Sequence, residues 1–247
     1  MSSINGIPIN ATTIKNCYQK FYPSTYKLLI QENLFHYLHL WGIRVATSDT
    51  SLPDDYIGGM RINNLNFLEI VSSKGSTDPS PSALIKLHDN EAKLKGGTAF
   101  VAEGQYTYTY MGSKFKVFSP LPSFCPTKPT RVYRWNPSAS DIKEWNNGKG
   151  KPLSTLFDLA LKNKKVIVST SSDTCIHRTW AKQQLWNDSA GCQVLTDDST
   201  LRTLGKWAVE HQRKKYGNSY IYTLFTKQQF ISANESPIKK IISFFNI

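Results

Sequence analysis

Two side chains in the second half of the chain have a context that suggests chemistry. His177 follows the apolar Ile176, and Cys192 follows a glycine and begins an apolar run. A free thiol has a pKa of about 8.5 and is mostly protonated at neutral pH, so a nearby imidazole must remove its proton or stabilise the thiolate. The pair therefore predicts a nucleophile, Cys192, and a general base, His177.

The elements expected around this pair would bring the two residues together. A strand is expected to end near His177, and the tight turn at 189–192 leads into the next apolar run. Gly191 would let the backbone come close to a substrate carbonyl, and the amides of Gly191 and Cys192 would donate to its oxyanion. Ser189 is expected to hydrogen-bond within the turn or to orient the imidazole.

These residues resemble the catalytic domain of bacterial L,D-transpeptidases, often called the YkuD domain, and especially its phage-associated variants. His177 matches the upstream histidine of that family. The family's turn is matched by Ser189, Gly191 and Cys192. The chain departs from the main pattern at Ala190, where a second histidine is common, and at Val194, where an arginine is frequent, so the family's substrate preference does not carry over directly.

The resemblance extends loosely upstream, over about residues 42 to 230 in all. Its short segments are Asp54–Gly58, Ser76–Pro79, Lys95–Ala99 and Glu103–Tyr106. It implies a mostly β fold with a few helices (α+β), a YkuD-like β-sandwich. It also implies that Cys192 attacks a stem-peptide carbonyl of peptidoglycan and forms a thioester, whose acyl group passes to an amine or to water.

Three further residues are expected to bind substrate. Arg178 and Trp180 could contact a glycan or a stem carboxylate, with a packing role equally open for both. Gln193, beside the nucleophile, is the third. Cys175 is expected on the same strand face as His177, where it either lines the site or is a buried thiol.

The composition excludes several classes of protein. Of 247 residues, 40% are hydrophobic, which is enough for a folded core, and the net charge of +12 favours anionic partners such as nucleic acid, acidic membranes or a cell-wall polymer. The basic residues are scattered, which is typical of solvated surface rather than of a nucleic-acid groove. No segment is apolar and long enough to span a bilayer, and no signal peptide is recognised.

The remaining cysteines and histidines suggest neither metal nor cofactor. The cysteines lie far apart, so free thiols are expected for Cys17, Cys125, Cys175 and Cys192. No cysteine or carboxylate stands at metal-ligand spacing from His36, His39 or His88, and His211 is expected to be structural.

The chain is expected to divide into an N-terminal helical extension (1–41), a catalytic domain (42–235) and a tail (236–247). Helices are expected at 26–41, 152–161 and 200–212. Strands are expected at 43–46, 55–62, 67–71, 97–101, 106–110, 116–118, 133–135, 165–170 and 220–225, and the 165–170 strand should be buried. Loops are expected at 72–82 and 119–130.

Two functions follow from these patterns. The first is a phage-encoded cysteine acyl-transferase or peptidase that acts on peptidoglycan stem peptides, present in the virion or in the host cytoplasm before lysis. The second is a non-enzymatic virion or tail protein that uses the same fold and its positive charge to bind cell wall, with other virion or tail proteins as further expected partners. A nucleic-acid binder is a weaker third interpretation.

Overall fold

The structure, a computed structural model, describes residues 2–31, 34–45, 53–86, 96–112, 121–146, 149–179 and 191–235. Helices and strands are mixed, which confirms the α+β class. The strands are β1 (Ser3–Ile4), β2 (Ile7–Pro8), β3 (His39–Arg44), β4 (Asp55–Ile62), β5 (Leu68–Ser76), β6 (Thr98–Val101), β7 (Gly104–Gly112), β8 (Ser123–Pro126), β9 (Thr130–Trp135), β10 (Ile167–Ser171), β11 (Ile176–Arg178), β12 (Gln193–Leu195) and β13 (Tyr220–Thr226). The helices are α1 (Ala11–Phe21), α2 (Pro23–Leu29), α3 (Pro81–Lys86), α5 (Ala139–Trp145), α6 (Leu153–Lys162), α7 (Asp198–Arg213) and α8 (Lys227–Asn234).

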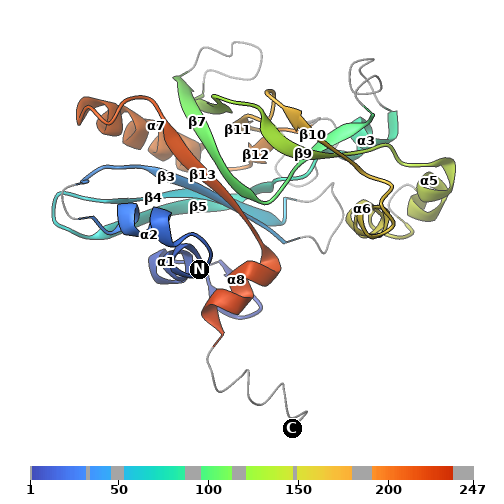
Figure 1. Ribbon diagram of the computed structural model, residues 1–247, viewed down its shortest axis with the longest axis horizontal. Coiled ribbons are helices and arrows are strands. Elements are labelled where there is room, and N and C mark those ends of the chain that lie inside the picture. The colour runs from blue at the N-terminus through green and yellow to red at the C-terminus, as the bar shows by residue number, and fades with distance from the viewer. Residues whose placement is uncertain are drawn as a thin grey trace, which may run out of the picture.

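The main sheet closes on itself. Its strands follow the order β11-β12-β5-β4-β3-β13-β7-β8, and β8 pairs with β11 to complete a barrel (Figure 1). Two of its pairings are parallel, β13 with β3 and β11 with β12. A closed barrel leaves no free strand edge, and this arrangement differs from the two facing sheets of the expected sandwich.

The barrel interior forms the largest core. It contains side chains from nearly every barrel strand and from α7, including Leu40, Ile57, Tyr108, Leu195 and Leu204. Asp197 caps α7 by accepting hydrogen bonds from the amides of the helix's first turn, and the apolar face of the helix then packs on the barrel. The expected helix at 200–212 is thus confirmed within slightly wider limits.

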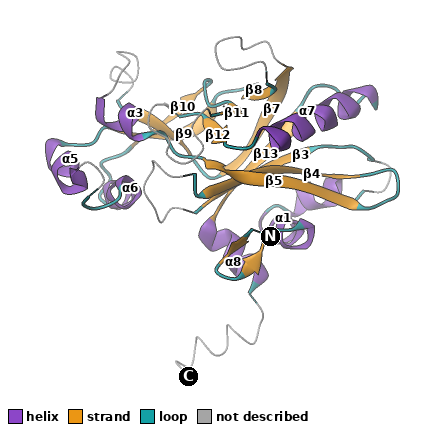
Figure 2. Cartoon of the chain, turned by 180° about the vertical axis from the view of Figure 1, so that it is seen from behind, coloured by secondary structure: helices purple, strands orange, loops and turns teal. Residues whose placement is uncertain are grey.

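The N-terminal helices and α8 cover the opposite side of β3 and β13 (Figure 2). There the structure corrects the sequence prediction, because the helix expected at 26–41 ends at Leu29 and His39–Arg44 is a strand. Both faces of β3 are buried, because Leu40 lies in the barrel and Trp41 lies under the helices. Apolar residues in such a strand do not alternate with polar ones, so their spacing can resemble that of a helix. The expected domain boundary at 41/42 therefore falls inside a strand.

A separate three-stranded sheet, β10-β9-β6, stands beside β11 and β12 with α5 and α6 packed against it (Figure 1). Its core is aromatic, with Phe100 stacked on Phe157. The prediction of a buried strand at 165–170 is wrong in its burial, because β10 is an edge strand and both Ile167 and Val168 are more than half exposed.

The other predicted elements agree with the structure to different extents. The strands at 55–62 and 220–225 are confirmed as β4 and β13. The expected loops are shorter than predicted, because β5 extends to Ser76, α3 begins at Pro81 and β8 lies within 119–130. The expected strand at 116–118 and the tail at 236–247 lie outside the described residues.

Candidate functional site

The parallel pairing of β11 with β12 places the predicted nucleophile and the predicted base on adjacent segments of the chain. His177 lies directly opposite Val194, so Cys192 is two residues back along the neighbouring strand. The register is held there by the Gln193 amide, which donates to the Cys175 carbonyl oxygen at 2.8 Å. Adjacent strands lie about 4.7–4.9 Å apart and the rise is about 3.3 Å per residue, so positions placed diagonally in this way have Cα atoms about 8 Å apart.

Both side chains belong to the outer face of the barrel. Ile176 and Leu195 point into the barrel core. Successive residues of a strand point to opposite faces, so His177, Val194 and Cys192 share the other side. This outer face is the one that meets the three-stranded sheet, since Gly191 lies against Ala99 of β6.

The imidazole of His177 is held in one orientation. The residue is buried, and its Nδ1 lies 2.7 Å from the carbonyl oxygen of Arg178. A carbonyl oxygen can only accept, so Nδ1 carries the hydrogen and the lone pair of the neutral ring is on Nε2. A neutral imidazole in this tautomer is suited to take a proton.

The thiol of Cys192 is protonated at rest. The residue is partly exposed, and its Sγ donates to the Asp173 carbonyl oxygen at 3.0 Å. Burial of the sulfur raises its pKa to about 11, an effect opposed by a hydrogen bond with the Cys175 backbone and reinforced by the charge of Asp173. Such a thiol needs a base at the moment of attack, rather than resting as a thiolate.

Gly191 is required by geometry. Its φ of +142° lies in a region that side-chain-bearing residues rarely adopt, and a Cβ there would be 2.9 Å from the Ala99 carbonyl oxygen. The backbone at position 191, immediately before Cys192, can therefore lie tightly against β6 only with glycine.

Of the expected substrate-binding residues, Gln193 is placed elsewhere. Its side chain is fully buried inside the barrel, where its Nε2 donates to Tyr108 Oη at 3.1 Å and its Oε1 accepts from the Tyr222 hydroxyl. The prediction that Gln193 contacts substrate is thus wrong, because the alternation that puts Cys192 outside puts the next residue inside.

Arg178 has a partner at the start of α7. Its Nε lies 2.8 Å from Oδ1 of Asp198, and both side chains are partly exposed. This ion pair joins the strand of His177 to the helix, so a stem carboxylate would have to compete with Asp198 for the guanidinium. Trp180 and Ser189, the other predicted site residues, lie outside the described residues.

Cys175 is not a free thiol, contrary to the expectation from sequence. It forms a disulfide with Cys125 of β8, with a Cα–Cα distance of 4.2 Å. Fifty positions separate the two cysteines in the chain, and only the closure of the barrel between β8 and β11 brings them together. Among the described cysteines, Cys17 and Cys192 are not part of a disulfide.

A buried charged network that the sequence analysis missed lies one strand from β12. Arg44 pairs with Asp78 at 2.8 Å, and both oxygens of Asp55 accept hydrogen bonds at 2.7 Å, one from Val45 and one from Thr77. Two segments that are distant in the sequence, around Asp55 and around Thr77, meet in this network. The network supports the end of β5, which pairs with β12 through Ser76 and Val194.

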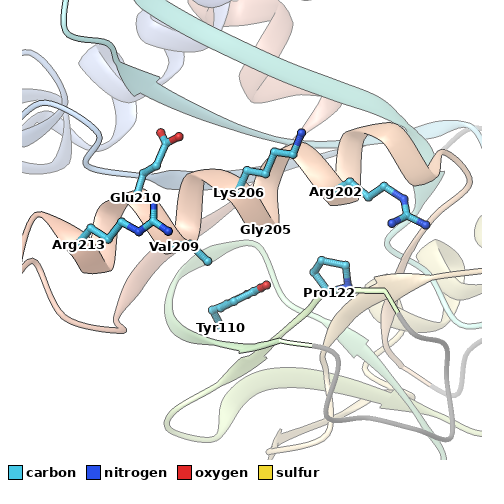
Figure 3. A pocket seen from close by; sticks show the side chains of 8 residues that line it. All are labelled: Tyr110, Pro122, Arg202, Gly205, Lys206, Val209, Glu210 and Arg213. Carbon is cyan, nitrogen blue, oxygen red and sulfur yellow. The ribbon is translucent and has the colours of Figure 1, made fainter.

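A basic groove runs along α7 (Figure 3). A cavity of about 480 Å³ is lined by Arg202, Lys206, Arg213 and Glu210 on the helix and by Tyr110 and Pro122 opposite. The helix approaches closely because Gly205 has no side chain, since a Cβ there would be 2.7 Å from Pro122 Cγ. Glu210 hydrogen-bonds to Arg61, which leaves the groove with a surplus of positive charge.

Within the part of the chain that the structure describes, no group of three or more His, Cys, Asp or Glu side chains could hold a metal ion. No helix among the described residues has the length and apolar character needed to cross a membrane. Comparison of the chain with protein-family models, with curated proteins and with solved structures finds no match.

Proposed function

We propose that this protein is a peptidoglycan-directed cysteine acyl-transferase or peptidase of the L,D-transpeptidase type, with a YkuD-like catalytic domain. The observation that supports the proposal most is that His177 lies on β11 and Cys192 directly precedes β12, the adjacent parallel strand, where strand alternation assigns both side chains to the outer face. The resemblance of the motif residues to phage-associated variants makes a phage product the proposed source, with stem peptides of the wall as substrate.

The first half-reaction begins with proton transfer from Cys192 to Nε2 of His177. The thiolate attacks the stem-peptide carbonyl carbon, and the backbone amides around Gly191 and Cys192 donate to the oxyanion. The tetrahedral intermediate collapses as its C–N bond breaks, and the imidazolium of His177 gives its proton to the departing amine. The product is a thioester on Cys192.

The second half-reaction releases the acyl group. An amine of another stem peptide or a water molecule attacks the thioester while His177 accepts its proton. The proton then passes to the Cys192 sulfur as the C–S bond breaks, which restores the resting thiol. Transfer to an amine gives a cross-link, and transfer to water gives a shortened stem.

Mass spectrometry of the intact protein tests this proposal. After incubation with purified disaccharide-tetrapeptide fragments, the mass should increase by that of an acyl fragment, and peptide mapping should place it on Cys192. Cys192→Ala should abolish the adduct, whereas Cys17→Ala, at the buried free thiol of α1, should retain it. Absence of any adduct, with wall turnover unchanged in Cys192→Ala, would reject the enzyme.

A second candidate, wall binding without catalysis, is favoured by the basic groove along α7. Arg202, Lys206 and Arg213 are exposed on one helix beside Tyr110, an arrangement that suits an anionic wall polymer. Binding to isolated walls should then weaken with salt and survive Cys192→Ala.

Two charge-reversal variants distinguish a specific role of the groove from a general effect of the net charge. Arg202→Glu with Lys206→Glu should reduce wall binding severalfold. Lys162→Glu with Lys164→Glu, at exposed positions at the end of α6, makes the same change in net charge away from the groove and should have little effect. Equal losses for the two pairs would mean that the groove has no specific role.

A further inference from the structure

Three of the cysteines lie side by side across neighbouring strands. In the barrel, β11 lies between β8 and β12, with Ile176 opposite both Phe124 and Gln193. Each of these three paired residues has a cysteine as its neighbour in the chain. Cys125 follows Phe124 on β8, Cys175 precedes Ile176, and Cys192 precedes Gln193. Cys175 is therefore flanked by a cysteine on each side.

The three side chains point the same way. Phe124 and Ile176 belong to the barrel core, and Gln193 is buried within the barrel. The neighbouring positions in each strand must face outward. Two contacts hold Cys192 at this place: its sulfur donates to the carbonyl oxygen of Asp173, and the amide of Gln193 donates to that of Cys175.

The spacing suits either of two disulfides. Adjacent strands lie about 4.7–4.9 Å apart, and disulfides join Cα atoms about 4.4–6.8 Å apart, so the separation between β11 and β12 is compatible with a bridge. Cys125 and Cys175 already form one across the other side of the same strand. A row of three sulfurs also gives the attacking thiolate an approach opposite the leaving sulfur.

We propose that Cys175 is an exchangeable disulfide site, which bonds to Cys125 in one isomer and to Cys192 in the other. The Cys192 thiolate attacks Sγ of Cys175, the Cys175–Cys192 bond forms, and the Cys175–Cys125 bond breaks. Cys125 leaves as a thiolate and takes up a proton from water, in place of the proton that Cys192 lost. One disulfide is exchanged for another, so no oxidant or reductant is consumed.

The exchange would regulate the proposed acyl transfer. This regulation rests on the proposed function, whereas the exchange itself does not. In the Cys125–Cys175 isomer the nucleophile is a free thiol, whereas in the Cys175–Cys192 isomer it is blocked. The same thiol thus serves catalysis or the disulfide, and the isomer ratio sets the active fraction.

Disulfide mapping of the full chain tests the exchange without any wall substrate. Protein incubated without reductant at pH 7 and pH 9 is quenched with acid, alkylated and digested. A population with a Cys175–Cys192 bridge and alkylated Cys125 should appear, and faster at pH 9, because burial raises the pKa of Cys192 to about 11 and the thiolate fraction grows about tenfold per pH unit. Exclusive Cys125–Cys175 pairing at both pH values would overturn the proposal.

A variant that lacks the competing partner gives a second test. Cys125→Ser treated with oxidised glutathione should form the Cys175–Cys192 disulfide and lose labelling of both thiols. Separate glutathione adducts on Cys175 and Cys192, with no disulfide between them, would also overturn the proposed exchange. Cys17→Ser should change neither result, and exchange without any acyl adduct would reject the enzyme while leaving the exchange intact.

Discussion

A Cβ atom added to Gly191 would lie 2.9 Å from the carbonyl oxygen of Ala99 and 3.1 Å from its Cβ. This close approach places the backbone just before Cys192 against β6 of the smaller sheet. A side chain at position 191 is therefore unfavourable for two reasons. The backbone has a positive φ of +142°, and there is no space for a Cβ atom. Position 191 tests whether the turn is built around glycine.

Gly191→Ala should lower the free energy of unfolding by about 1–3 kcal/mol from backbone strain alone, with a further loss from the contact at Ala99. Chemical denaturation measures this change. Gly217→Ala is a matched control, because its φ of +80° is also positive but a Cβ there meets nothing within 4 Å. A smaller loss at 191 than at 217 would contradict the packing argument.

His177→Asn should reduce acylation of Cys192 about 10²- to 10⁴-fold at pH 7, because a thiol whose pKa is raised to about 11 then lacks its base. The pH profile provides the sharper readout. In the variant, the rate should rise about tenfold per pH unit up to the pKa of the thiol, whereas in the parent, where His177 removes the proton, the rate should depend less steeply on pH. Superimposable profiles would remove His177 from the role of base.

Gln193→Leu should destabilise the barrel by about 1–3 kcal/mol, since it leaves the buried hydroxyl of Tyr222 without its acceptor. Adding Tyr222→Phe should recover part of that loss, because the second change removes the unpaired group. Denaturation of the two single variants and the double variant gives the coupling energy. Strict additivity would show that the buried hydrogen bond contributes little.

Stability should fall in mild acid because of two buried histidines. Burial lowers the pKa of His39 to about 3 and that of His211 to about 4. Both folded values lie below the unfolded value of about 6.5, so the unfolded chain binds protons first, and the stability present above pH 6.5 is lost as the pH falls.

Each of these histidines should contribute a slope of up to about 1.4 kcal/mol per pH unit below pH 6.5. His39→Phe should reduce the slope, because the ring packs beside Tyr18 and Tyr37 and its nitrogens have no hydrogen-bond partner among the described residues. Urea titrations from pH 7 to pH 4.5 measure it. An unchanged slope in the variant would mean that His39 does not titrate on unfolding.

The sequence by itself determined the local features of this protein. The α+β class, the strands β4 and β13 and the helix α7 follow from the spacing of apolar residues along the chain. The choice of Cys192 and His177 as a candidate pair also needed no coordinates, because it rests on residue type and on the glycine before the thiol.

The tertiary structure decided what depends on pairing between distant strands. Barrel closure made a disulfide from Cys125 and Cys175, which are remote in the chain. The side chain of Gln193, which was expected in the site, points into the barrel core instead. Residues 39–41, which were expected to be helical, belong to the strand β3, which is buried on both faces. Each of these outcomes depends on which strand becomes the neighbour, and local sequence does not encode that choice.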